Sequence, residues 1–239
     1  MTGDITLLIG VAASIGFVHT ILGPDHYIPF IMLSKASQWN VRKTAFITLL
    51  CGIGHVLSSV ILGLIGIALG IAVSKLGIIE SFRGSLAAWL LIGFGLAYFI
   101  WGIKRATQNK THSHVHIHDN KIAHSHLHSH TDEHMHVHLK ESESDKKITP
   151  WILFIIFIFG PCEPLIPLIM YPAAKHSTIG ILAVSGVFAI VTISTMLTVV
   201  LSFFYGLSLL PVWKMEKYSH AIAGLTIFLS GGAIQFLGL

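Results

Sequence analysis

Six long apolar stretches restrict this chain to one class of structure. They cover residues 5–33, 44–73, 84–103, 150–173, 178–210 and 216–238, and each reaches the roughly 20 residues that a helix needs to cross a bilayer. Charged residues make up only 11% of the chain, against about 25% in soluble domains. Because unpaired backbone groups are costly in hydrocarbon, the spans must be helical. We therefore predict an all-α integral membrane protein with six transmembrane helices, or seven if a short segment follows 178–210.

The basic residues predict how the chain is oriented. Twelve of the 15 lysines and arginines fall in connections 34–43, 104–149 and 211–217, which six spans place on one side of the membrane. The other side receives Lys75, Arg83 and Lys175. The positive-inside rule makes the first side cytosolic and puts both termini outside, in a membrane such as the bacterial inner or plasma membrane. The same topology explains the pI of 9.1, so we expect the lipid bilayer as a partner and no nucleic acid.

A polar, histidine-rich segment at 105–149 separates two membrane regions, 1–104 and 150–239. Its His-x-His pattern has no apolar face to bury, which predicts a disordered cytosolic loop. Imidazole binds transition metals near neutral pH, so the loop is expected to collect, buffer or sense metal ions. The histidines concerned are His112, His114, His116, His118, His124, His126, His128, His130, His134, His136 and His138.

Two related motifs indicate an internal repeat. The run from Gly23 to Met32 recurs, with one insertion, from Gly160 to Met170. Each run opens a set of three spans, and an odd number of spans inverts the second set, so we predict a 3+3 inverted repeat. The glycine-proline pair in each run should break the first helix of each half. Non-helical backbone at membrane depth is tolerated where it lines a cavity or is buried in protein, which predicts a central site.

Ionisable side chains occupy both predicted breaks. Inserting such groups into a membrane costs free energy, so their presence there indicates a function. Asp25 and His26 lie in the first break, and Cys162 and Glu163 lie in the second. Histidines in the first and second spans add imidazole donors. This mixture of donors suits nickel, cobalt or zinc rather than calcium or magnesium. The predicted central metal site therefore consists of His19, Asp25, His26, His55, Cys162 and Glu163.

The run from His19 to His26 resembles the first-span signature of nickel/cobalt transporters and the related urease-accessory-type membrane proteins. The run from Gly160 to Pro164 resembles the second-half motif of the urease-accessory type. The histidine-rich loop resembles that of nickel/cobalt efflux proteins. This resemblance implies that His19, Asp25 and His26 take part in metal recognition.

The function expected from these features is transport of a divalent transition-metal ion, with nickel or cobalt favoured and zinc next. The ion is cargo, no organic cofactor is expected, and the chain is not expected to be an enzyme. A membrane-bound delivery or sensing factor, working with a metalloenzyme maturation factor, is the main alternative. A thiol oxidoreductase would need a second thiol where the first half has Asp25 or His26. An anion exporter is disfavoured by Asp25 and Glu163.

Overall fold

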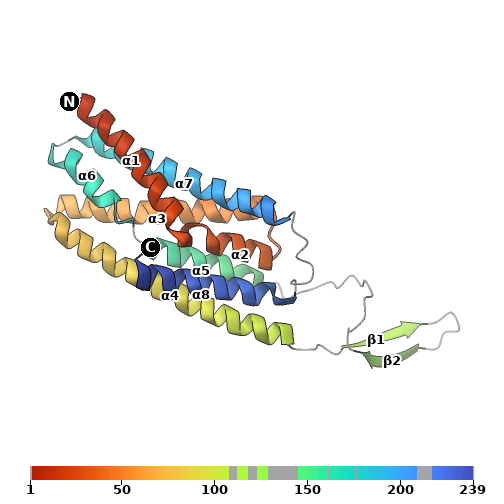
Figure 1. The fold of residues 1–239 in the computed structure, drawn as a ribbon. Helices are drawn as coiled ribbons and strands as arrows, with labels where there is room; N and C mark the ends of the chain where they lie inside the picture. The colour runs from red at the N-terminus through yellow and green to blue at the C-terminus, as the bar shows by residue number, and fades with distance from the viewer. Residues whose placement is uncertain are drawn as a thin grey trace.

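The computed structural model describes residues 2–107, 112–117, 123–128, 145–160, 162–175, 177–208 and 217–238. Long helices lie roughly along one axis, and a small hairpin projects from one end of the bundle (Figure 1). The helices of the first part are α1 (Thr2–Leu22), the 3-10 turn η1 (Pro24–His26), α2 (Ile28–Ala36), α3 (Val41–Ala68) and α4 (Val73–Thr107). The second part contains α5 (Asp145–Phe159), α6 (Leu165–Ala174), α7 (Thr178–Ser208) and α8 (Ser219–Leu237).

Five of the described helices, α1, α3, α4, α7 and α8, are long and apolar enough to cross a membrane. Large apolar side chains on these helices point away from the bundle, as Phe17, Phe46 and Phe82 illustrate with exposures of 53%, 63% and 70%. An outer surface this apolar is suited to lipid rather than to water. The fourth expected span, 150–173, is instead divided between α5 and α6, whose apolar parts are each shorter than a full span.

The first break lies where the sequence predicts it. The amide of Gly23 still donates to the carbonyl of His19 at 3.0 Å, but Pro24 has no amide hydrogen to continue the helix. Pro24 instead starts the short η1 turn, and α2 begins two residues after it ends. Because α1 alone is of spanning length, α2 adds a separate short helix to the first expected span.

The second break is also confirmed. Helix α5 ends at Phe159 and α6 begins at Leu165. Pro164 cannot donate an amide hydrogen, so a continuous helix through this point would lose a bond to the Gly160 carbonyl. The non-helical residues 160 and 162–164 therefore separate two helices of 15 and 10 residues.

Helix α4 corrects one prediction. The apolar pattern placed a span at 84–103 and assigned Lys75 and Arg83 to an outer connection, but α4 is a 35-residue helix that contains both. Glu80 lies one turn before Arg83, and the two side chains form an ion pair with 2.6 Å between Oε1 and Nη1. A charge pair at i and i+3 cancels its own net charge, so the helix can continue where separate charges would favour a connection.

The broken helices pack against the long helices of the other part of the chain. Helix α1 lies along α7, and α5 lies along α3 (Figure 1). Helix α4 contacts α8 most extensively, and glycines line this contact. A Cβ atom added at Gly95 would overlap the backbone of Phe228, and one added at Gly224 would overlap the backbone of Phe99. Small residues thus allow two helices to approach at backbone distance, which is how membrane helices gain packing energy.

The described part of the histidine-rich segment forms a hairpin where we expected an unstructured loop. Strands β1 (His112–Ile117) and β2 (Ala123–His128) pair antiparallel, with His112 opposite His128 and His116 opposite His124. The His-x-His alternation has the two-residue period of a strand, which the disorder prediction did not take into account. His118, His130, His134, His136 and His138 lie outside the described residues, and metal binding by the loop stays a prediction.

Candidate metal centre

The candidate site lies between two apolar clusters of the core. One cluster includes Phe157 and Met196, and the other includes Val56 and Phe188. His55 on α3 is 1% exposed and lies with its ring centroid 6.0 Å from that of Phe157. The ring of His19 on α1 lies 6.5 Å from that of Phe188. The imidazoles are therefore held by packing against aromatic rings rather than by solvent.

Three side chains from different elements place potential ligand atoms together. One ligand atom from each of His19, His55 and Cys162 lies within 4.8 Å of the other two. Cys162, in the second break, is fully buried, and its Sγ lies 3.3 Å from Nε2 of His55. Nε2 of His19 and Nδ1 of His55 are buried without a hydrogen-bond partner among the described residues. Buried polar atoms are usually paired, so the unpaired nitrogen of His19 indicates that a ligand can occupy this space.

His26 on η1 adds a fourth donor beside this trio. Its Nε2 lies 3.3 Å from Nε2 of His55, and its ring is 4.9 Å from that of His19. Its Nδ1 faces two acceptors, Asp25 Oδ1 at 3.0 Å and the Gly23 carbonyl at 3.2 Å. Nδ1 must therefore carry a proton and donate it, which leaves the lone pair of Nε2 directed at the cluster.

The pairing of Asp25 with His26 is the arrangement found behind metal-binding histidines. A carboxylate that accepts from the far nitrogen fixes the tautomer and orientation of the ring and makes the other nitrogen a better ligand. Asp25 was predicted as a ligand, and the structure places one of its oxygens 3.0 Å from Nδ1 of His26. The same short turn thus supplies a donor and the group that orients it.

Gly23 and Gly160, each followed by a proline in the sequence, lie against histidines of the site. A Cβ atom at Gly23 would overlap the ring of His26 and lie 2.9 Å from Asp25 Oδ1. A Cβ atom at Gly160 would lie 2.9 Å from Nδ1 of His55. The glycines therefore do more than interrupt the helices, because only a residue without a side chain lets the backbone pass this close to the imidazoles.

A cavity of about 760 Å³ reaches the candidate site from one side. It lies among α1, the first half of α4 and the end of α8, in the half of the bundle away from the hairpin. His19, Asp25 and His26 line it, together with Glu163, which is exposed there. Glu163 was predicted as a central ligand; the structure places it on the cavity wall, outside the His19, His55 and Cys162 trio.

The donors in this site favour one class of ion. Imidazole nitrogen and thiolate sulfur bind nickel, cobalt, zinc and copper, whereas magnesium and calcium take oxygen ligands. Three or four such donors match the coordination that zinc and cobalt adopt in proteins. Cys51, the other cysteine, is buried in the apolar cluster that contains Phe157 and is a free thiol.

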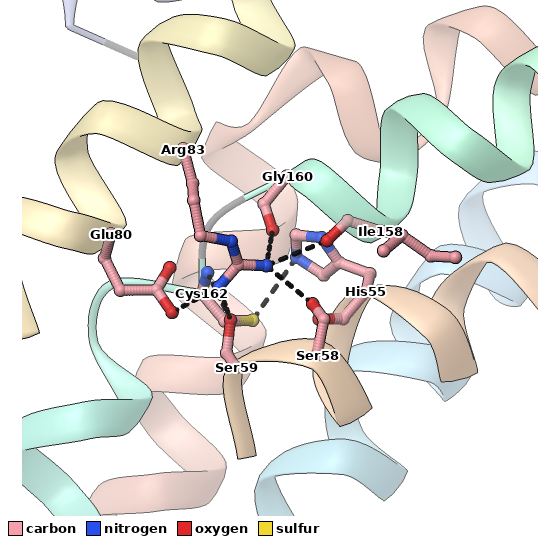
Figure 2. A network of polar contacts seen from close by, with 8 residues as sticks. All are labelled: His55, Ser58, Ser59, Glu80, Arg83, Ile158, Gly160 and Cys162. Carbon is pink, nitrogen blue, oxygen red and sulfur yellow. Dashed lines mark hydrogen bonds and ion pairs between the residues drawn. The ribbon is translucent and has the colours of Figure 1, made fainter. Parts of the chain in front are cut away.

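A second polar network adjoins the site and was not predicted from the sequence. Figure 2 shows Arg83 between Glu80, the serines of α3 and the backbone of the second break. Glu80 is fully buried, while the Arg83 side chain is 15% exposed. The available signal was the spacing of Glu80 and Arg83, a carboxylate and a guanidinium one helical turn apart next to an apolar stretch.

Comparisons with family models, curated proteins and solved structures found no match to this chain.

Proposed function

We propose that this protein transports a divalent transition-metal ion across a membrane, with nickel or cobalt the favoured cargo and zinc next. The observation that carries the proposal is the trio of half-buried His19 with buried His55 and Cys162, whose ligand atoms lie within 4.8 Å of one another. Burying histidines in an apolar membrane bundle costs free energy, so histidines at such positions usually have a function. Here the buried Nε2 of His19 lacks a hydrogen-bond partner among the described residues, and Nε2 of His55 lies 3.3 Å from the thiol of Cys162.

The position of the site in the chain supports transport rather than storage. The ligands come from α1, from α3 and from the second break, so the ion would be held where both interrupted helices meet. Transporters commonly bind their cargo near the bilayer midplane, at interrupted helices of two repeats. We propose that residues 1–104 and 150–239 form such an inverted repeat of three spans each, with α5 and α6 together acting as one span. The reciprocal packing of α1 on α7 and of α5 on α3 supports this pairing of the two halves.

The cavity supplies a route for the ion. We propose that it opens to the outer side of the membrane, because it lies away from the basic, histidine-rich end of the bundle, which the positive-inside rule makes cytosolic. Asp25 and Glu163 would attract a hydrated cation to its wall before the ion loses water to the nitrogen and sulfur donors. The loop histidines would bind the ion more weakly on the cytosolic side, in a bacterial inner or plasma membrane.

The two cysteines favour metal binding over thiol exchange. Cys51 and Cys162 are unpaired and belong to different apolar clusters, whereas thiol-disulfide exchange needs two sulfur atoms that can meet. We therefore propose that Cys162 acts as a ligand and that the chain is not an enzyme. An anionic cargo is disfavoured by the carboxylates on the cavity wall.

The test is time-resolved uptake of nickel, cobalt and zinc into liposomes that contain the full chain in known orientation. We expect metal-selective flux in the native protein and its loss in His55→Ala, because His55 contacts both His26 and Cys162. His220→Gln is the matched control. His220 forms a hydrogen bond with Tyr98 in the second half of α4, whereas the cavity lies at the first half. Absence of flux for every metal in the native chain would contradict transport and favour a delivery or sensing factor.

A further inference from the structure

The second break leaves two backbone carbonyls without their helical donors. In a continuous helix the Ile158 carbonyl would accept from the amide of Cys162, but that amide donates to Ser59 Oγ at 3.2 Å. The Gly160 carbonyl would accept from residue 164, which is proline and has no amide hydrogen. Unpaired carbonyls at the end of a buried helix need donors from elsewhere.

Arg83 on α4 supplies these donors. Its Nη2 donates to the Ile158 carbonyl at 2.8 Å and lies 3.4 Å from the Gly160 carbonyl. The guanidinium therefore holds the end of α5 and the start of the irregular segment that carries Cys162 (Figure 2). It reaches across the proposed boundary between the two halves of the chain.

The same guanidinium holds the turn of α3 that follows His55. Nη2 donates to Ser58 Oγ at 2.7 Å, and Nη1 lies 3.4 Å from Ser59 Oγ. The Ser58 hydroxyl in turn donates to the carbonyl of His55 at 2.8 Å, while Ser59 Oγ accepts from the Cys162 amide. Arg83 thus bonds to serine side chains of α3 and to backbone carbonyls of the second break, the two segments that carry the contacting pair His55 Nε2 and Cys162 Sγ.

Glu80 makes this arrangement possible in an apolar surrounding. Its Oε1 accepts from Arg83 Nη1 at 2.6 Å, and the carboxylate is fully buried. A buried guanidinium needs a counter-charge and hydrogen bonds to its remaining nitrogens. With Glu80 on one nitrogen and with serine and carbonyl oxygens on the other, the plane of the guanidinium is fixed.

We propose that Arg83 is a positioning residue of the metal site, which sets the separation of the His55 and Cys162 ligands by holding the second break against α3 and α4. The inference rests on the proposed metal site and deepens it. A planar guanidinium can bond several acceptors at fixed angles, whereas a lysine ammonium is a single point on a flexible stem. Arg83→Lys therefore keeps the positive charge and loses the positioning.

The experiment titrates cobalt into the purified full chain in detergent and records its absorption spectrum. A thiolate-to-cobalt charge-transfer band reports ligation by sulfur, and the visible bands report coordination geometry. We expect the native chain to show the charge-transfer band and Cys162→Ser to lose it. We expect Arg83→Lys to bind cobalt about 10–100-fold more weakly, with a reduced charge-transfer band. Lys75→Met is the matched control, because Lys75 is an exposed cation on the same helix, and it should change neither quantity.

The outcomes separate this inference from the proposed function. If the native chain lacks the charge-transfer band, or Cys162→Ser retains it, the metal site itself is wrong. If the native band is present and folded Arg83→Lys matches native affinity and spectrum, the positioning role is overturned and the site stands. Should Arg83→Lys not fold, Ser59→Ala decides, because it removes an oxygen shared by Arg83 and the Cys162 amide. Native affinity and spectrum in folded Ser59→Ala would overturn the inference.

Discussion

Cys162 Sγ lies 3.3 Å from Nε2 of His55, although 107 residues separate them in the chain. This contact joins the second break to the middle of α3, and both side chains are buried. A thiol and an imidazole at this distance share one proton in the absence of a metal, and a divalent ion can replace that proton.

Removing the sulfur should weaken binding of soft and borderline metals. Cys162→Ser keeps the size of the side chain but replaces a thiolate ligand with a poorly acidic hydroxyl. We expect affinity for nickel, cobalt and zinc to fall at least about tenfold, or about 1.4 kcal/mol, in competition titrations with a chromophoric chelator. Cys51→Ala is the control, because Cys51 lies one helical turn before His55 in an apolar cluster but is not one of the three grouped ligand residues. Equal losses in both variants would show a general effect of thiol removal and not ligation.

Asp25→Asn should impair the site without removing a metal ligand. A carboxylate can only accept from His26 Nδ1, whereas the asparagine amide can also donate to it. The substitution therefore no longer forces the proton onto Nδ1 and the lone pair of Nε2 toward the cluster. We expect metal affinity to fall by about 10–100-fold, as for other carboxylates behind metal-bound histidines.

Ser14→Ala is the matched control for this prediction. Ser14 lines the same cavity, but its hydroxyl donates to the Gly10 carbonyl of its own helix. Isothermal titration of both variants should therefore separate the effect of Asp25 on His26 from a general change in the cavity. An unchanged affinity in Asp25→Asn would remove the orienting role of the carboxylate.

Metal binding should release protons from the site. The thiol of Cys162 must lose its proton to become a ligand, so affinity should decrease as the pH falls. If one proton is displaced, the apparent affinity should fall about tenfold for each pH unit of acidification. This dependence should hold below the pH at which the site is already deprotonated in the metal-free protein. Cys162→Ser should release about one proton fewer per ion, measured with a pH indicator in weakly buffered solution. The same proton count in both proteins would exclude Cys162 as the titrating ligand.

The contact between α4 and α8 should be sensitive to single methyl groups. Gly95→Ala places a Cβ atom against the backbone of Phe228, so the helices must separate. We expect a loss of about 1–3 kcal/mol in stability, seen as a lower unfolding temperature in detergent.

Gly93→Ala provides the internal comparison. Gly93 lies on the same helix with nothing within 4 Å of an added Cβ atom, so the substitution should leave the unfolding temperature unchanged or slightly raised. Helix propensity favours alanine over glycine at both positions, so a similar decrease for both substitutions would show that the contact with α8 does not determine the effect.

Deleting residues 110–140 should reduce metal capture and leave transport in place. The trio and the cavity lie outside this segment, so the deleted chain retains the proposed path. We expect flux in liposomes to persist at saturating metal, with a higher half-saturating concentration. Complete loss of flux in a correctly inserted protein would make the loop the working part and favour a delivery factor.

The sequence predicted the helices and breaks because both depend on local chemistry. Apolar length predicts a span, and a proline without an amide hydrogen predicts an interruption, so both breaks were found at Gly23-Pro24 and at residues 160–164. The same reasoning brought His19, His55 and Cys162 into one predicted site, and the structure places them together.

Features that depend on partners across the fold were missed. Arg83 was assigned to a connection because a charge normally ends an apolar stretch, whereas Glu80 and the carbonyls of the second break satisfy it inside α4. Glu163 adjoins Cys162 in the chain, yet it faces the cavity, because the irregular backbone of the break turns neighbouring residues in different directions. Sequence order alone carries no information on that turn.

X-ray absorption at the metal edge tests the central site most directly. The sample is the full chain with its eleven loop histidines replaced by asparagine and less than one equivalent of cobalt or zinc, so that the loop does not compete. We predict one sulfur at about 2.3 Å with two or three nitrogens at about 2.0–2.1 Å, and loss of the sulfur in Cys162→Ser. A shell of nitrogen and oxygen alone in the protein that retains Cys162 would contradict the proposed site.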